Sequence, residues 1–343
     1  MKYRALVTAE VITPMLDSLK ESIDFDFDGY YIDHEVMPVD ELKTKIKDYD
    51  ILVCEYDTID KEILDCAENL KLIICCRGGV KSVIDLETAK EKGIIICNNG
   101  GRNAQAVSDF TIAFILDLTR NISKSNALIQ NKVITTDVKS KPDNYQDTVW
   151  GLDNNSPFIR FRGKSVNHMV LGLVGCGFAG SLVAKKASVF GMEIIAYDPF
   201  IDPARVPDFV KFVDFSELLE KSDIISLHCN VTPESKNMFN KDTFAKMKQG
   251  SYFINTARGE LVNEADLIDA LNSHHIAGAA IDVTFKEPIS SDCPLLDAEN
   301  LIITPHIAGS SYDVQVCGTQ MVKDALEDFL AGIKPRNCVV YNK

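Results

Sequence analysis

The sequence has no apolar run approaching the roughly 20 residues that a membrane-spanning helix needs. Its beginning reads as a strand and lacks the apolar core of a secretory signal peptide. Basic residues are also few, because 36 lysines and arginines stand against 50 aspartates and glutamates, for a net charge of −14. Nucleic acids and anionic membranes both require a basic footprint on a protein partner. We therefore expect neither as a partner, and an anionic substrate would need a local basic pocket.

Cysteine spacing argues against a metal centre. The ten cysteines include no Cys-x-x-Cys pair, so a zinc site is not expected and we predict no bound metal. Most of them sit in apolar, strand-like runs, where a reduced thiol behaves as a small hydrophobic side chain. Thiols stay reduced in the cytoplasm, which is the compartment we expect.

Length and composition favour two α/β domains. The chain has 343 residues, which is long for one domain, and 46% of them are hydrophobic. Apolar strand-like runs alternate with amphipathic helix-like stretches, a pattern typical of βαβ units and a parallel sheet. The first series of strands is expected near residues 3–8, 51–54, 72–75 and 94–97, and a long apolar helix is expected at 104–119.

Two other segments stand apart from this alternation. Residues 135–162 are polar, have no clear period and contain Trp150, the only tryptophan. We interpret them as a surface loop or arm, with an inert insertion as the alternative. Residues 314–330 read as a final amphipathic helix before a short tail.

A glycine motif opens the second series of strands. The run Gly175-Cys176-Gly177-Phe178-Ala179-Gly180 follows an apolar strand at 169–174 and begins a helix-like stretch. In such a motif the first glycine permits a tight turn, the second lets the backbone approach a pyrophosphate, and the third lets the helix pack on the strand. The helix N-terminus then presents free N–H groups and partial positive charge to the phosphates. A bare match can be a surface turn, but this context predicts a dinucleotide site.

An acidic residue indicates which dinucleotide is bound. The next strand, 193–197, is followed directly by Asp198. A carboxylate at this position accepts hydrogen bonds from the adenosine ribose and repels a 2′-phosphate. We therefore predict NAD rather than NADP as the cofactor.

Polar residues and glycine stand at the ends of all the strands in the second series. Ligands of an open parallel sheet bind outside the carboxyl ends of its strands, so these residues form a concentrated site signal. The strands are expected to end at Gly175, Asp198, His228, Asn255, Asp282 and His306.

Four ordered blocks resemble the D-isomer-specific 2-hydroxyacid dehydrogenase family, including its phosphoglycerate dehydrogenase group. They are the glycine run through Asp198, residues 255–263 (NTARGELVN), residues 278–288 (GAAIDVTFKEP) and residues 304–311 (TPHIAGSS). The resemblance covers nearly the whole chain. It implies an α/β fold with two doubly wound parallel-sheet domains, and a homodimer formed through the NAD domain.

The same resemblance implies where the domains begin and end. A Rossmann NAD domain, residues 104–308, would be inserted into a flavodoxin-like substrate domain made of residues 1–103 and 309–343. Hinges are expected near Asn103 and Gly309. An independent flavodoxin-like domain is the alternative for the first series of strands, and the C-terminal helix argues against it.

Three residues of these blocks suit the oxidation of a 2-hydroxy acid. The reaction removes a proton from oxygen, and His306 supplies an imidazole that titrates near neutral pH. Glu287 is expected to hydrogen-bond the other ring nitrogen, which sets the tautomer and favours the charged imidazolium. Arg258 is a planar, permanently charged fork that can hold the substrate carboxylate and polarise the carbonyl.

The loop after the strand at 72–75 is a second candidate site. Gly78 and Gly79 leave backbone N–H groups accessible to a carboxylate. The resemblance implies that this loop contacts the substrate carboxylate and that Asn103 lies near the substrate. Arg77 and Lys81 add two positive charges, which favour an acid with a second anionic group such as 3-phosphoglycerate.

The resemblance also implies which residues line the cofactor, beyond the three glycines. They are Val80, Phe178, Ala179, Asp198, His228, Cys229, Asn230, Thr256, Ala257, Asp282 and Gly309.

Some positions depart from the family pattern and leave alternatives open. Phe178 replaces a frequent arginine, Asn230 stands where proline is usual, and Thr284-Phe285 alters the stretch before Glu287. These changes bear on substrate identity rather than on reaction type. An NAD-sensing scaffold like the corepressors of this family is one alternative, and a phosphite-oxidising enzyme with the same triad is another. A formate dehydrogenase is disfavoured because that group lacks the glutamate partner.

Overall fold

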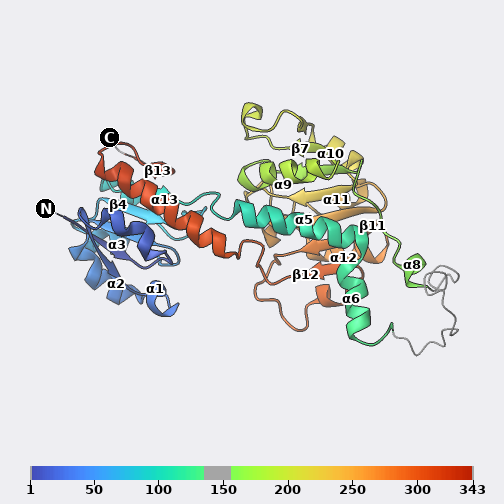
Figure 1. Cartoon of the computed structure of the whole chain (residues 1–343), viewed down its shortest axis with the longest axis horizontal. Helices are drawn as coiled ribbons and strands as arrows, with labels where there is room; N and C mark the ends of the chain where they lie inside the picture. Colours follow the sequence, from blue (N-terminus) through green and yellow to red (C-terminus); the bar gives the residue numbers. More distant parts are fainter. Residues whose placement is uncertain (1, 135–155, 342–343) are drawn as a thin grey trace. The chain divides into compact units, whose positions relative to one another are not determined.

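The computed structural model describes residues 2–134 and 156–341, which divide into two compact units. The first unit consists of Met1–Asn103 and Ser310–Lys343, and the second of Ala104–Gly309. The second unit is thus inserted into the sequence of the first. In Figure 1 the first unit holds the blue and red ends of the chain, and the second holds its green to orange middle.

The first unit is a six-stranded sheet in the order β13-β5-β4-β3-β1-β2. Its strands are β1 (Tyr3–Val7), β2 (Ile23–Phe27), β3 (Ile51–Cys54), β4 (Leu72–Cys75), β5 (Ile95–Asn98) and β13 (Cys338–Val340). Its helices are α1 (Tyr30–Asp33), α2 (Val39–Lys45), α3 (Lys61–Cys66), α4 (Leu86–Glu91) and α13 (Tyr312–Leu330), with short 3-10 turns η1 (Thr13–Leu19) and η2 (Ile46–Asp48). Strands β1 to β5 pair in parallel and β13 runs antiparallel to β5. Their order matches the 2-1-3-4-5 arrangement of flavodoxin-like sheets.

The second unit is a seven-stranded sheet in the order β12-β11-β10-β9-β6-β7-β8. Its strands are β6 (Val170–Val174), β7 (Glu193–Tyr197), β8 (Lys211–Phe212), β9 (Ile224–Leu227), β10 (Ser251–Asn255), β11 (Ile276–Ile281) and β12 (Leu301–Ile303). Its helices are α5 (Ala104–Arg120), α6 (Ile122–Gln130), α8 (Pro157–Arg160), α9 (Phe178–Val189), α10 (Phe215–Lys221), α11 (Lys241–Lys246) and α12 (Glu264–Asn272), with 3-10 turns η3 (Pro203–Arg205), η4 (Gly259–Leu261) and η5 (Pro294–Asp297). Every strand pair is parallel. The first six strands follow the Rossmann order 3-2-1-4-5-6, and the order reverses between β6 and β9.

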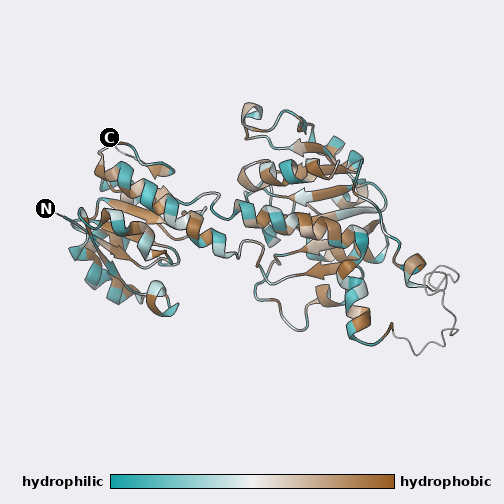
Figure 2. Ribbon diagram, in the orientation of Figure 1, coloured by the Kyte–Doolittle hydropathy of each residue, from teal (hydrophilic) through white to brown (hydrophobic). Residues whose placement is uncertain are grey.

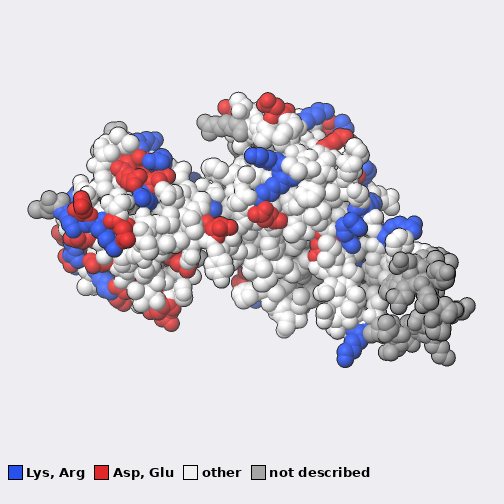
Figure 3. Space-filling view, viewed as in Figure 1, with Lys and Arg blue, Asp and Glu red and all other residues white. Residues whose placement is uncertain are grey.

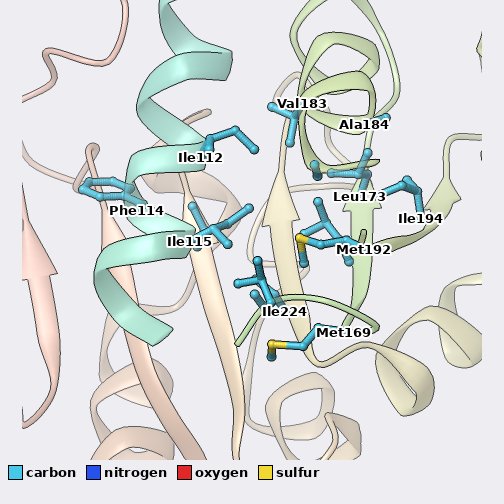
Figure 4. Packing of buried hydrophobic residues seen from close by; sticks show 14 of the residues in the cluster. Ile112, Phe114, Ile115, Met169, Leu173, Val183, Ala184, Met192, Ile194 and Ile224 are labelled. Carbon is cyan, nitrogen blue, oxygen red and sulfur yellow. The ribbon is translucent and has the colours of Figure 1, made fainter. Parts of the chain in front are cut away.

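Both faces of each sheet are buried, which explains the continuous apolar strands. In β3, Leu52 packs into one core and Val53 into the other. In the second unit, Figure 4 shows Ile112 and Ile115 of α5 beside Val183 of α9, in the same cluster. A parallel sheet covered on both faces loses the alternation of apolar and polar residues that a half-exposed sheet has.

Surface properties follow from this layering. Figure 2 shows helices with both teal and brown residues, as expected for helices with one face on the sheet. Figure 3 shows acidic and basic side chains interspersed on the visible face of the first unit. Within residues 2–134 and 156–341, no helix combines the length and apolarity needed to cross a membrane.

The structure differs from the sequence predictions at a few points. The last strand of the second unit, β12, ends at Ile303 and not at His306, because Pro305 has no N–H for a ladder and His306 has a positive φ of 58°. The final helix begins at Tyr312, where the Ser311 side chain accepts the Asp313 N–H. Of the polar stretch 135–162, residues 135–155 lie outside the described residues, and the remainder contains α8.

The C-terminal helix belongs to the first unit. Val322, Ala325 and Leu326 of α13 are buried in a core that also contains Val53 of β3 and Ile74 of β4. The strands of the first unit therefore share their core with a helix that follows the second unit in the sequence. This packing argues against an independent N-terminal domain.

Candidate active site

The three glycines of the nucleotide motif have three different surroundings. Gly175 has a φ of +93°, and a Cβ added there would lie 2.7 Å from the backbone of His228. A Cβ on Gly180 would collide with the carbonyl oxygen of Gly175. A Cβ on Gly177 would meet nothing within 4 Å. The outer glycines are thus required by close packing, whereas the middle one borders open space at the N-terminus of α9.

These surroundings fit a pyrophosphate. Gly177 is the N-cap residue of α9, a 12-residue helix, and no side chain caps its first N–H groups. Free N–H groups at such an end carry partial positive charge and bind phosphate. The open side of Gly177 leaves room for a ligand to approach the backbone. NAD fits this turn, which lies at the point where the strand order reverses.

Asp198 is held in place by the backbone around the glycine turn. Its Oδ2 accepts the N–H of Cys176 at 2.8 Å, and its Oδ1 accepts the N–H groups of Phe200 at 3.0 Å and Ile201 at 3.2 Å. The carboxylate therefore fastens the end of β7 to the glycine turn after β6. Both carboxylate oxygens of Asp198 are thus bonded to the backbone.

His228 and Cys229 follow β9 on the other side of the glycine turn. Burial lowers the pKa of His228 to about 4, so the ring is neutral near pH 7. Its Nε2 lies 2.9 Å from the Ser226 hydroxyl. Burial also raises the pKa of the Cys229 thiol to about 11. Neither side chain brings charge to the nucleotide site.

Asn255, at the end of β10, shapes the turn that carries Arg258. Its Oδ1 accepts the Ala257 N–H at 3.0 Å, and its Nδ2 donates to the Arg258 carbonyl at 2.8 Å. Thr256 is buried, with its hydroxyl 3.2 Å from that of Thr111. The Arg258 side chain is exposed, and its Nη1 donates to the Ala257 carbonyl at 2.6 Å.

His306 and Glu287 are in direct contact. The His306 Nδ1 lies 2.7 Å from the Glu287 Oε2, with the side chains 45% and 37% exposed. The other carboxylate oxygen, Oε1, accepts the Thr284 N–H at 3.1 Å. An ionised carboxylate only accepts hydrogen bonds, so Nδ1 carries a hydrogen and Nε2 is the nitrogen left for a ligand.

Asp282 holds the backbone that presents His306. His306 has a positive φ of 58°, a conformation that costs about 1–3 kcal/mol for a residue with a Cβ. The Asp282 carboxylate accepts the N–H groups of Ile307 at 2.9 Å and Ala308 at 2.7 Å, and the Thr304 hydroxyl at 2.5 Å. Its backbone carbonyl accepts the His306 N–H at 2.8 Å. Both oxygens of this carboxylate are thus bonded to the loop of His306.

The candidate substrate loop lies in the first unit. Arg77 places its guanidinium 5.6 Å from the ring centroid of Tyr56, and Lys81 is exposed. Gly78 and Gly79 are exposed, and the Asn98 side chain donates to the Gly78 carbonyl at 2.6 Å. The loop therefore has a fixed base and an open, positively charged surface.

The remaining candidates differ in how accessible they are. Val80 is only 3% exposed and packs in the core of the first unit. Phe178 is 68% exposed. Ala179 and Gly309 are half-buried, and Asn103 and Asn230 are exposed.

Two residues that the sequence did not indicate support the site. Thr284 donates its N–H to Glu287, and Ser226 contacts the His228 ring. A contact made by a backbone N–H cannot be predicted from residue type, and a single serine within an apolar strand does not by itself indicate a functional role.

Comparison with known proteins agrees with this geometry. Residues 112–308 match the family model described as D-isomer specific 2-hydroxyacid dehydrogenase, NAD binding domain. The chain is 33% identical to a hydroxypyruvate reductase of Blautia hydrogenotrophica, over 94% of this chain and 93% of that protein. It is 34% identical to a glyoxylate reductase of Thermofilum pendens, over 96% of this chain and 91% of that protein.

A solved structure shows the same fold. The TT0316 protein of Thermus thermophilus is 31% identical and superimposes with a TM-score of 0.77, over 98% of this chain and 100% of that one. These relatives do not favour the NAD-sensing scaffold that the sequence left open. The chain belongs to the D-isomer-specific 2-hydroxyacid dehydrogenases and is an NAD-dependent oxidoreductase.

Proposed function

We propose that this enzyme interconverts a 2-keto acid and a 2-hydroxy acid through Arg258, Glu287 and His306. The observation that carries the proposal is the 2.7 Å contact between Glu287 and His306. It leaves Nε2 of the ring free to exchange a proton with the substrate oxygen. Glu287 stabilises the imidazolium form, which donates during reduction. Arg258 holds the substrate carboxylate as a two-pronged donor.

The bound nicotinamide would supply or accept the hydride. For its binding we propose a set of residues of the second unit, around the glycine turn and the strand ends: Gly175, Gly177, Phe178, Ala179, Gly180, Asp198, His228, Cys229, Asn230, Thr256, Ala257, Asp282 and Gly309. Val80, which the resemblance also implied, is buried in the core of the first unit and is left out of this set. Asp282 acts in this proposal mainly by holding the loop of His306. The NAD domain would then be residues 104–308, and the substrate domain residues 1–103 and 309–343.

We further propose that the substrate is a short acid with a second anionic group, bound by Arg77, Gly78, Gly79, Lys81 and Asn103. Three of the four arginines in the first unit, Arg4, Arg102 and Arg336, pair with carboxylates. Arg77 has no carboxylate partner within the described residues and packs against Tyr56. In a chain of net charge −14, a guanidinium without a carboxylate partner within the described residues is a suitable anion receptor.

A panel of 2-keto acids tests the reaction and the substrate class together. NADH oxidation would be followed with glyoxylate, pyruvate, hydroxypyruvate and 3-phosphohydroxypyruvate. Turnover of none of them by an enzyme that binds NADH would contradict the proposed reaction. Loss of a charged hydrogen bond corresponds to roughly a 10- to 100-fold change. Arg77→Gln should therefore raise the KM for the phosphorylated acid by about that factor and change the KM for pyruvate far less.

Lys47→Gln is a matched control for that variant. Lys47 is exposed on the first unit, in η2, and its replacement removes the same charge. We expect it to leave both KM values unchanged. Equal effects of Arg77→Gln on the phosphorylated acid and on pyruvate would contradict the second anionic group.

We also propose a cytoplasmic homodimer. All ten cysteines are free thiols, which suits a reducing compartment. In the second unit, α6 exposes Ile122 and Ile129, and α8 exposes Phe158. Apolar side chains of this size on a surface are typical of an interface between subunits. Analytical ultracentrifugation should give twice the chain mass of 38.0 kDa, and a monomer at micromolar concentration would contradict the proposal.

A further inference from the structure

The segment between Asp282 and Glu287 connects several parts of the site. The Thr284 N–H donates to Glu287 Oε1 at 3.1 Å, and the Thr284 hydroxyl donates to the Lys286 carbonyl at 2.8 Å. Glu287 is therefore held on one oxygen by its own loop and on the other by His306. The Thr284 N–H belongs to the peptide before Thr284, so the position of Glu287 depends on how the Thr284 backbone is held, including by the peptide that follows it to Phe285.

One external side chain holds that peptide. The Phe285 N–H donates to Oε1 of Glu264 at 2.6 Å, across 21 residues of sequence. Glu264 is the first residue of α12, whose N-cap Asn263 accepts the Asp266 N–H. Leu267 and Leu271 of the same helix are buried in the core of the second unit. The acceptor is thus mounted on a helix that is fixed to the sheet.

The Phe285 side chain offers no second anchor, because it is 60% exposed. A Cβ on Gly259 would collide with the Thr284 carbonyl group. The turn that carries Arg258 consequently packs directly against the same peptide. A shift of the Thr284–Phe285 peptide would disturb the seat of Glu287 and the neighbour of Arg258 together.

We propose that Glu264 is a positioning residue for the reaction, which holds Glu287 against His306 by accepting the Phe285 N–H. The proposal rests on the proposed roles of Glu287 and His306. The Glu264 side chain acts here as a hydrogen-bond acceptor, so its charge is not required. An amide oxygen at the same place should serve nearly as well as the carboxylate.

Two variants separate these properties. Glu264→Ala removes the acceptor, and we expect kcat for keto-acid reduction to fall by up to roughly 10-fold, the upper end of the effect of losing one ordinary hydrogen bond. The basic limb of the pH profile should move to lower pH, because a displaced Glu287 no longer favours the imidazolium. Glu264→Gln should retain kcat within about threefold and keep the unsubstituted profile. The dissociation constant of NADH should be the same in all three proteins.

The position of a pH limb does not depend on how much of a preparation is folded, so partial misfolding of Glu264→Ala would not hide the result. An unchanged pH profile in Glu264→Ala would overturn the proposal. A Glu264→Gln variant as defective as Glu264→Ala would overturn it too, because charge would then be the property that matters. If Glu287→Gln also left the profile unchanged, the proposed roles of Glu287 and His306 would be wrong, which is a separate failure.

Discussion

Glu287→Gln tests the contact on which the proposed chemistry depends. Glutamine keeps the size and an acceptor oxygen for the His306 Nδ1–H, but it removes the negative charge. A hydrogen bond to a charged group contributes about 1.5–3 kcal/mol. The two side chains are 45% and 37% exposed, and solvent screening reduces the contribution of such a pair to about 0.2–1 kcal/mol. A loss of about 1 kcal/mol is a factor of about 5 in an equilibrium.

The direction of the effect follows from the proton that His306 carries. Keto-acid reduction uses the imidazolium, so activity falls on the basic side of the profile. Without the carboxylate the imidazolium is less favoured, and this fall should occur at lower pH. Hydroxy-acid oxidation uses the neutral ring, so the rise of activity on the acidic side should also move to lower pH. Both limbs moving in the same direction is the expected signature.

The assay is NADH formation or consumption across the pH range, with kcat/KM taken at each pH for both directions. Glu193→Gln is the control, because Glu193 is exposed and begins β7, at the amino end of the sheet and away from the site. Its two profiles should superimpose on those of the unsubstituted enzyme. A Glu287→Gln enzyme whose limbs stay in place, or move to higher pH, would refute the reasoning.

Three further predictions concern the nucleotide site. The pKa of His228 falls from 6.5 in the unfolded chain to about 4 in the folded protein, so the unfolded chain takes up a proton first as the pH drops through this window. The free energy of unfolding should decrease by about 3 kcal/mol as the pH falls through this window. His228→Gln should lack this decrease in urea titrations. An equal decrease in the unsubstituted and the His228→Gln proteins would contradict the prediction. Gly177→Ala should weaken NADH binding by about 10-fold or more and leave the melting temperature unchanged. Gly180→Ala should lower the melting temperature by several degrees. If both variants behaved alike, the contrast between open space at Gly177 and close packing at Gly180 would be wrong. Asp198→Asn should raise the ratio of kcat/KM for NADPH to that for NADH by about 10-fold, since a charge repulsion is lost, and an unchanged ratio would remove Asp198 from cofactor choice.

Much of the architecture could be predicted because it depends on local patterns. Residues 51–54 and 72–75 were expected as strands, and they are β3 and β4. The edge strand β2 was not predicted, since its sequence IDFDF places two aspartates within five residues. Strand β12 was predicted three residues too long, because the apolar run before His306 does not reveal that the His306 backbone is left-handed.

The candidate site was only partly open to the same reasoning. Glycine, acid and histidine at the strand ends could be recognised because strand ends are marked by a change from apolar to polar residues. The support around them could not be recognised. Asp282 was assigned to the cofactor, yet both its oxygens bond to the loop of His306. Glu264 resembles any acid in the first turn of a helix.

The sequence alone determined the parallel α/β class, the nucleotide motif and the order of chemically capable residues along the chain. These properties depend on residue type and on spacing within short stretches of sequence. Only the tertiary structure decided how these residues are supported: Asp282 holds the loop of His306, Glu264 accepts the Phe285 N–H beside Glu287, and Arg77 has no carboxylate partner within the described residues. The physical reason is that these contacts join residues remote in sequence, often through backbone N–H groups that every residue type except proline possesses.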